Sequence, residues 1–153
     1  MLFQKINRNS PDKVFIICKN GESTRLPAGT PMCFDYTTQA DGNAVIVPTT
    51  AMLYAFAGVI AEDETYMGTS GQPDAYGKIQ VYGHHNKIYV SGSTVTPGAM
   101  LAPLDGKTYL HLAVTHANSS VEAPTEKNAY VIAGTTQNST TGFVQIIGFI
   151  RAL

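Results

Sequence analysis

The stretch Tyr76–Gly92 reads Tyr-Gly-Lys-Ile-Gln-Val-Tyr-Gly-His-His-Asn-Lys-Ile-Tyr-Val-Ser-Gly, and it decides the fold class. Apolar and polar residues alternate on both sides of a central Gly-His-His-Asn segment at 83–86. Alternation with a period of two is typical of a β-strand with one buried face, and a Gly/Asn break between two such runs predicts a turn. We therefore expect a β-hairpin here, with its turn at 83–86.

The second half of the chain repeats the order of the first half. Gly142–Gly148 matches Gly77–Gly83 in both glycines, in the central glutamine and in the apolar positions. Three further pairs of segments match in the same order: Leu26–Met32 with Val95–Leu101, Asp41-Gly42 with Asp105-Gly106, and Ala57–Ala61 with Ala129–Ala133. Matches in one order predict an internal pseudo-duplication, although two copies are too few for a solenoid.

The remaining segments favour short strands over helices. Val14–Cys18 is a β-branched and aromatic run that ends at Asn20-Gly21, a strong hairpin signal. No stretch shows a sustained helical apolar period with capping signals. Short strands separated by regular turn signals predict an all-β fold, either a small β-sandwich or a partly open barrel. We expect a single β domain over 13–153, preceded by an extended N-terminal arm over 1–12.

Composition limits the classes of partner. Only 14% of the 153 residues are charged and the net charge is −1, so the sequence does not favour nucleic acid as a partner. No apolar run approaches the ~20 residues that span a bilayer, so we expect no membrane partner. The first residues lack the apolar segment of a signal peptide, so we expect synthesis in a cytoplasm. Five of the 10 Lys and Arg residues lie within the first twenty-five positions.

Candidate chemical groups are few. His84-His85 is a possible metal pair, but adjacent residues on a strand point to opposite faces. The acidic segment Glu62-Asp63-Glu64 could hold a hard cation or supply paired carboxylates, but solvated charge is ordinary where a loop begins. Neither a nucleophile elbow nor a phosphate-binding loop is present. The sequence therefore predicts no enzyme, no cofactor, no metal and no small-molecule substrate.

Two smaller features have interpretations of their own. Gly58–Tyr66 is similar to the Gly-Val-Ile-Asp…Tyr motif of trimeric dUTP pyrophosphatases, but Ala61 stands where that motif has its aspartate, and the other signatures of the family are absent. Cys18 and Cys33 could pair only if their strands are neighbours. In a reducing compartment buried thiols are favoured over a disulfide.

The ordered set of motifs resembles the small capsid decoration, or cement, proteins of tailed bacteriophages. The matching elements are Leu-Pro-Ala-Gly-Thr-Pro-Met-Cys-Phe-Asp-Tyr (26–36), Phe-Ala-Gly-Val-Ile-Ala (56–61), Tyr-Gly-Lys-Ile-Gln-Val-Tyr-Gly (76–83), Val-Ser-Gly (90–92), Val-Thr-Pro-Gly-Ala-Met-Leu (95–101) and Phe-Ile-Arg-Ala-Leu (149–153). The resemblance implies a viral structural protein on the capsid exterior of the virion. Such a protein binds the major capsid protein on the outer surface of a mature phage capsid, often as a homotrimer, and stabilises the capsid by bridging neighbouring capsomers.

Two sets of residues fit that role. The capsid-binding arm would use backbone strand addition and apolar or basic side chains; its residues are Leu2, Phe3, Lys5, Ile6 and Arg8. The apolar run from 53 to 60 is either buried on both sides or packed against another subunit of a three-fold ring; the subunit-interface residues would be Leu53, Tyr54, Phe56, Val59 and Ile60. The alternative function is a carbohydrate-binding or receptor-binding β module displayed on a virion surface. The sequence has eight tyrosines but no tryptophan, whereas sugar-binding platforms favour the two exposed together.

Overall fold

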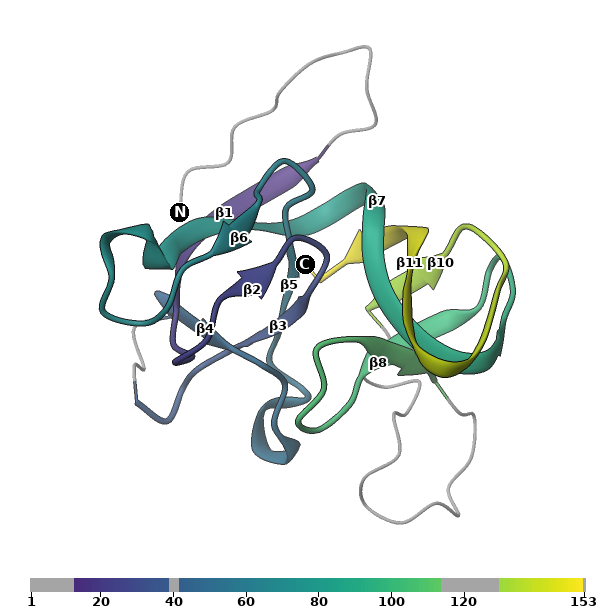
Figure 1. The fold of residues 1–153 in the computed structure, drawn as a ribbon, viewed down its shortest axis with the longest axis horizontal. Helices are drawn as coiled ribbons and strands as arrows, with labels where there is room; N and C mark the ends of the chain where they lie inside the picture. The colour runs from purple at the N-terminus through teal and green to yellow at the C-terminus, as the bar shows by residue number, and fades with distance from the viewer. Residues whose placement is uncertain (1–12, 39–41, 114–129, 153) are drawn as a thin grey trace.

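A computed structural model describes residues 13–38, 42–113 and 130–152 of the chain (Figure 1). The predicted N-terminal arm (1–12) lies outside the described residues. Over these residues the fold is all-β, as the sequence predicts, and it includes the 3₁₀ turns η1 (Thr50–Met52) and η2 (Pro73–Ala75). The strands are β1 (Val14–Asn20), β2 (Leu26–Pro27), β3 (Pro31–Phe34), β4 (Ala44–Ile46), β5 (Phe56–Ile60), β6 (Tyr66–Met67), β7 (Tyr76–Val95), β8 (Met100–Pro103), β9 (Leu110–Leu112), β10 (Val131–Ala133) and β11 (Gln137–Arg151).

The first half of the chain forms a small barrel. Within the described residues, β1, β4, β3, β5 and the first part of β7 are hydrogen-bonded in that order, and β7 pairs back with β1. The barrel interior is apolar, and its fully or nearly fully buried residues are Cys18, Leu26, Met32, Val45, Ala57, Ile60, Met67, Ile79 and Val81. The short ribbon of β2 and β6 lies beside this barrel (Figure 1). Closure of the ring satisfies backbone groups that an open sheet edge would expose.

The second half forms a second barrel by the same scheme. In the described part of the chain, the second part of β7 pairs with β9, and β8, β10 and β11 complete the ring back to β7. Its interior residues include Ile88, Val90, Leu101, Leu110 and Ile150. Cys33, Phe56 and Val59 of the first barrel belong to the same cluster. One of the two apolar clusters is therefore shared by both barrels, whereas the other lies within the first barrel.

Backbone hydrogen bonds show which residues of the two barrels are equivalent. The amide of Gly29 donates to the carbonyl of Ile60 at 2.9 Å, and the amide of Gly98 donates to the carbonyl of Ala133 at 2.8 Å. Both glycines have a positive φ, 92° and 86°. The predicted match between the segments that carry these two turns is confirmed. The counterpart of Ala133 is Ile60, however, and not Ala61, so that predicted match is wrong by one residue.

The last predicted match is wrong by a larger shift. Ile79 pairs with Ile60, and Gly148 pairs with the counterpart of Ile60, Ala133. Ile79 and Gly148 therefore occupy equivalent places in the two barrels. The sequence match aligned Gly148 with Gly83, four residues away. Shared glycines and a shared glutamine produced a convincing alignment that the strand register does not follow.

The predicted hairpin turn at 83–86 is also wrong, because β7 runs through this segment without reversing. Gly83 has a φ of 101°, and here β7 passes from the first barrel to the second (Figure 1). The side-chain amide of Gln80 donates to the backbone carbonyls of Tyr82 at 3.3 Å and His84 at 3.0 Å. These two hydrogen bonds tie the backbone on both sides of Gly83 to the Gln80 side chain. The two parts of β7 find partners in different barrels, so the glycine makes a corner instead of a turn.

Asn20-Gly21 does not form the expected hairpin either, because β1 pairs with β7 and β4 and not with the strand that follows it. The Asn20 side chain is buried, and its amide donates to the carbonyls of Thr24 and Gly68 at 2.9 and 2.8 Å. Its Oδ1 accepts from the amide of Glu22 at 2.9 Å. The asparagine therefore shapes a wider loop and ties it to the segment after β6.

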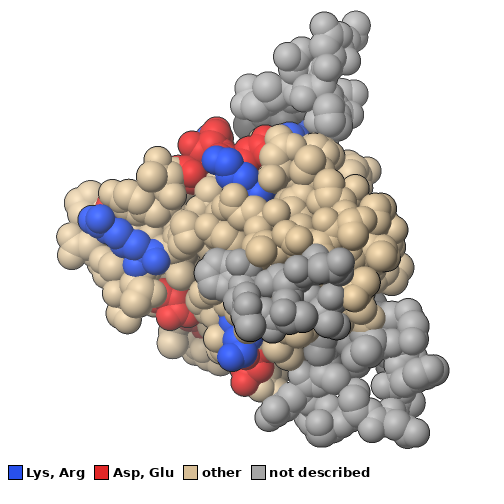
Figure 2. All heavy atoms as spheres, turned by 45° about the vertical axis from the view of Figure 1, so that its right-hand side comes forward, with Lys and Arg blue, Asp and Glu red and all other residues tan. Residues whose placement is uncertain are grey.

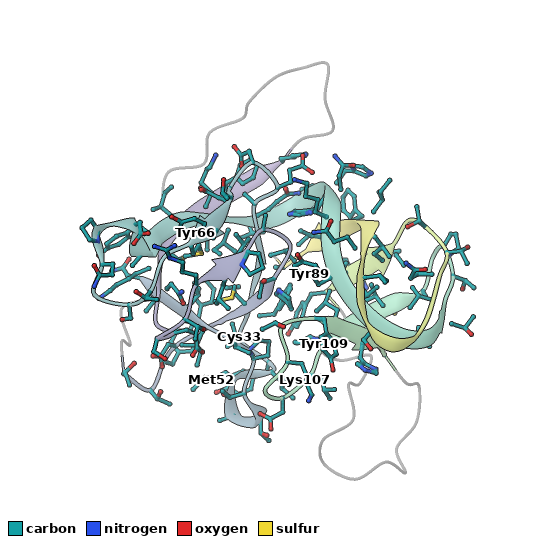
Figure 3. The ribbon with its side chains drawn as sticks, viewed as in Figure 1. Cys33, Met52, Tyr66, Tyr89, Lys107 and Tyr109 are labelled. Carbon is teal, nitrogen blue, oxygen red and sulfur yellow. The ribbon has the colours of Figure 1, made fainter. Side chains whose placement is uncertain are left out.

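The two cysteines are free and buried, which confirms the preference for thiols over a disulfide. Cys18 lies in the core of the first barrel, whereas Cys33 belongs to the cluster that both barrels share (Figure 3). Burial raises the pKa of Cys18 to about 11 and that of Cys33 to about 12. Both thiols therefore stay protonated and unreactive at neutral pH.

Candidate functional site

An exposed strip of apolar and basic side chains lies on the outside of the first barrel. We define the outer strip as Phe15, Ile17 and Lys19 of β1 with Tyr76 and Lys78 of β7. Lys19 is paired with Tyr76 and Ile17 with Lys78, so these side chains share one face of the sheet. Ile17 is 65% exposed and Tyr76 is 61% exposed, values that are high for apolar side chains on a strand. The strip begins beside Lys13, the first described residue.

The strip has the composition of a protein-binding surface. The ammonium of Lys78 lies 6.0 Å from the centre of the Phe15 ring, at the limit of a cation–π contact. Aromatic side chains are enriched at protein interfaces, and exposed apolar groups that form a contiguous patch mark interaction sites. The sequence pattern predicted the strand but not this exposed face. Apolar residues on both faces of the 14–20 segment were the signal that could have indicated it.

The acidic segment Glu62–Glu64 is held in place by lysines and backbone amides. Lys13 forms an ion pair with Glu62, and Lys78 forms one with Asp63. The other oxygen of Glu62 accepts from the amide of Asn86 at 2.9 Å. Burial opposes the charge on Glu62, but the hydrogen bonds from Lys13 and Asn86 outweigh it and lower the pKa of that carboxyl. The segment therefore anchors β1 to the corner of β7.

His85 is a core residue and not a free imidazole. Its side chain is fully buried, and its Nδ1 accepts from the amide of Lys87 at 3.0 Å. Nε2 lies 3.0 Å from the carbonyl of Ile60, so this nitrogen carries the proton. Burial lowers the pKa of His85, which keeps the ring neutral. Both nitrogens are engaged, so neither is available to a metal ion.

A shallow polar hollow of about 330 Å³ lies next to the acidic segment. Its walls are Pro27, Ala28, Glu62, Asp63, Glu64, Thr65, Lys87, Tyr89 and Gln145. The sequence analysis identified the acidic segment and the neighbouring histidines, and the structure brings Glu62 and Asn86 together here. Two of the three carboxylates already pair with lysines, and Glu64 accepts from the backbone amide of Lys78 at 3.2 Å. The hollow therefore offers a polar surface without an evident acid–base pair.

Within the described ranges, no group of three or more His, Cys, Asp and Glu side chains is placed to share a metal ion. Also within these ranges, no helix is both long enough and apolar enough to cross a bilayer.

The predicted subunit interface needs correction. Leu53, Phe56, Val59 and Ile60 are buried inside the chain itself, so they present no surface to another subunit. Phe56 and Val59 contribute to the core that the two barrels share, and Ile60 points into the first barrel. Of the two interpretations of this run, burial on both sides is the one that the structure supports. Of the five predicted residues, Tyr54 alone is exposed, at 67%, and one exposed side chain does not make a subunit interface.

Other aromatic residues lie at separate places on the surface. Tyr66 lies on the β2–β6 ribbon, where the guanidinium carbon of Arg25 lies 4.6 Å from the ring centre (Figure 3). The ring of Tyr130 stacks on Phe56 with centroids 5.0 Å apart, and its hydroxyl donates to the carbonyl of Tyr54 at 3.1 Å. Figure 2 shows the charged side chains in small separate groups, with broad uncharged surface between them. The exposed aromatic residues therefore lie apart from one another, and Tyr66 lies beside a charged side chain.

The predicted arm residues Leu2, Phe3, Lys5, Ile6 and Arg8 lie outside the described residues. The sequence matches no protein-family model, and no curated protein matches it.

Proposed function

We propose that this protein is a viral structural protein that binds the outer surface of a mature phage capsid and stabilises it by bridging neighbouring capsomers. The proposal joins the sequence resemblance to cement proteins with one structural observation, the outer strip. Ile17 and Tyr76 are exposed on a sheet whose opposite face is fully packed. Exposed apolar side chains on a sheet with a complete core of its own favour contact with another protein.

The place of the outer strip supports this role. The strip lies beside Lys13, where the predicted arm joins the barrel, and Glu62 fixes that point through its ion pair. A partner that contacts the strip is therefore within reach of the basic and apolar residues of 1–8. Arm and strip would then bind one partner together, which raises affinity through effective concentration. That partner is the major capsid protein in this proposal, and the protein binds it as a homotrimer.

The test is co-sedimentation with expanded, undecorated capsid shells. We expect the wild-type protein to bind in a saturable, symmetry-related copy number. The double substitution Ile17→Asp and Tyr76→Asp should weaken binding by about tenfold or more, because a charge replaces each exposed anchor. Tyr54→Asp is the matched control, since Tyr54 is as exposed but lies away from the strip. Wild-type protein that does not bind, or strip variants that bind like Tyr54→Asp, would contradict the proposal.

The arm has a test of its own. Deletion of residues 1–8 removes Leu2, Phe3 and Ile6 but leaves every strand of the two barrels in place. We expect the truncated protein to stay folded by circular dichroism and to bind shells more weakly. Unchanged binding would show that the arm does not contact the capsid.

The polar hollow favours one alternative function, a carbohydrate-binding or receptor-binding module on a virion surface. Tyr89, Lys87 and Gln145 line it together with carboxylates, and such groups bind sugar hydroxyls. A glycan array decides between the two functions. Specific binding that is lost in Tyr89→Ala would support the alternative, whereas a cement protein should bind none of the glycans.

A further inference from the structure

The two barrels place equivalent rows of residues on their outer faces. Each row crosses three neighbouring strands through directly paired residues. The row in the first barrel is Pro31, Val59 and Gln80. The row in the second barrel is Met100, Ile132 and Phe149. The turns at Gly29 and Gly98 precede the first member of each row at the same distance in sequence, two residues. The repeat therefore gives both barrels the same outer face.

The row of the first barrel is covered by the second barrel. Pro31 is buried, and Val59 and Gln80 are fully buried. Val59 belongs to the apolar cluster that also holds Ile88 and Ile150 from the interior of the second barrel. One barrel of this chain thus uses this face to pack against another barrel. The face is an interface already, within a single chain.

The corresponding row of the second barrel is open. Met100 is 36% exposed, and Ile132 and Phe149 are only half-buried. Tyr82, also exposed, contacts Phe149 edge-on with ring centroids 5.1 Å apart and extends the apolar surface. We call Met100, Ile132, Phe149 and Tyr82 the open row. It is mainly apolar, and the counterparts of Met100, Ile132 and Phe149 in the first barrel are all buried.

We propose that the open row is a self-association surface that packs against a second copy of this chain. The occupant follows from the repeat, since the equivalent face of the first barrel already binds a barrel of the same architecture. A contact that continues the intramolecular arrangement from one chain to the next is heterologous and can close into a ring. This surface replaces the predicted contact through Leu53–Ile60, which the fold buries.

The inference can be tested apart from capsid binding because Met100, Ile132 and Phe149 lie on strands that the outer strip does not use. Tyr82, which pairs with Val14 of β1, is the one open-row residue beside the strip. The outer strip belongs to β1 and the first part of β7, whereas the open row lies mainly on β8, β10 and β11. A variant of one surface is therefore a matched control for the other. Loss of self-association and loss of shell binding can be measured separately.

The test is sedimentation velocity without capsid, at protein concentrations from micromolar to millimolar. We expect the wild-type protein to sediment as an oligomer of its 16.4 kDa chain. Met100→Glu should weaken association by about tenfold or more, because it places a charge in an apolar contact. The strip variant, Ile17→Asp with Tyr76→Asp, should associate like wild type. Circular dichroism verifies folding, and Ile132→Glu serves as a second row variant if Met100→Glu unfolds.

Three results would overturn the inference. They are a wild-type protein that stays monomeric at every concentration, folded row variants that associate like wild type, and a strip variant that loses association while the row variants keep it. Capsid binding by a strictly monomeric protein would overturn the open row and the proposed homotrimer, but it would leave the proposed capsid binding standing. An oligomer that depends on the open row but does not bind capsid shells would overturn the proposed capsid binding and leave the open row standing.

Discussion

The carbonyl of Gly29 accepts a hydrogen bond from the amide of Tyr89, 3.1 Å away, and this bond joins the two barrels. Gly29 lies so close to β7 that a methyl group on its Cα would overlap the carbonyl oxygen of Lys87. Gly98, its counterpart, has nearly the same positive φ but nothing within 4 Å of such a methyl group. The Gly29 turn therefore packs tightly against the second barrel, whereas the equivalent Gly98 turn has open space at this position.

Substitutions at these two glycines distinguish the cost of backbone strain from the cost of disturbed packing between the barrels. Gly98→Ala should destabilise the fold by about 1 kcal/mol, the cost of a left-handed conformation for an L-residue. Gly29→Ala should cost about 3 kcal/mol or more, because the new methyl group must also push β7 away. Urea denaturation of both variants measures the difference. Equal losses would show that Gly29 does not seal the contact between the barrels.

The turn after β3 predicts a pH effect. The Asp35 carboxylate accepts from the hydroxyl and amide of Thr37 at 2.7 and 3.0 Å, and from the hydroxyl and amide of Thr38. These bonds, the Thr37 hydroxyl first, lower the pKa of Asp35 from 3.8 to about 2. Because the folded state holds the proton more weakly than the unfolded state, this stabilisation is complete above the unfolded pKa and is lost as the pH falls towards 2.

Asp35→Asn should remove that contribution, which is about 2 kcal/mol at most at neutral pH. The variant should be less stable than wild type at pH 6, and the difference should shrink as the pH falls from 3.8 towards 2. Thermal unfolding of both proteins across this range provides the measurement. A difference that does not change with pH would show that the carboxylate is not held by these bonds.

The strand pattern predicted the all-β fold and the first turn match because both depend on local signals. Period-two alternation reports a strand with a buried face wherever it occurs, and a left-handed turn requires glycine at both Gly29 and Gly98. The repeat of these signals was therefore visible in the sequence. Its full register was not, because matched residue types do not reveal which backbone groups pair.

The errors share one physical cause, which is the choice of strand partner. Gly83 permits either a reversal or a corner, and only the positions of β1 and β11 decide between them. The apolar run of β5 requires burial on both sides, but the covering element is the second barrel and not another subunit. The outer strip was not predicted because the apolar run Val14–Cys18 indicates a strand but does not show which of its faces the fold leaves exposed.

The buried His85 predicts a second effect of pH on stability, at higher pH than the effect of Asp35. Burial lowers the pKa of this histidine below its ordinary value of 6.5, and the ring stays neutral between Ile60 and Lys87. The unfolded chain takes up the proton more readily, so stability should decrease as the pH falls below 6.5. His85→Gln should reduce that dependence as well as overall stability. Proton uptake on unfolding, measured near pH 6 in both proteins, tests this; equal uptake would refute it.

The acidic segment allows a final comparison between two neighbouring carboxylates. Glu62 is three-quarters buried and binds both Lys13 and the amide of Asn86, whereas Asp63 is mostly exposed and pairs with Lys78 alone. Partly buried, hydrogen-bonded charges contribute more than exposed ion pairs. Glu62→Gln should therefore cost about 1–2 kcal/mol, and Asp63→Asn less than about 0.5 kcal/mol.

The substitutions of Glu62 and Asp63 also test how β1 is anchored. Because the pKa of Glu62 is lowered in the fold, its contribution is present at neutral pH and is lost as the pH falls through that pKa. Limited proteolysis near Lys13 should be faster in Glu62→Gln than in wild type, since the bond from Lys13 to the β7 corner is weakened. Asp63→Asn should be cut at the wild-type rate. If both variants were cut equally fast, the anchoring of β1 would have to come from its ladder with β7 alone.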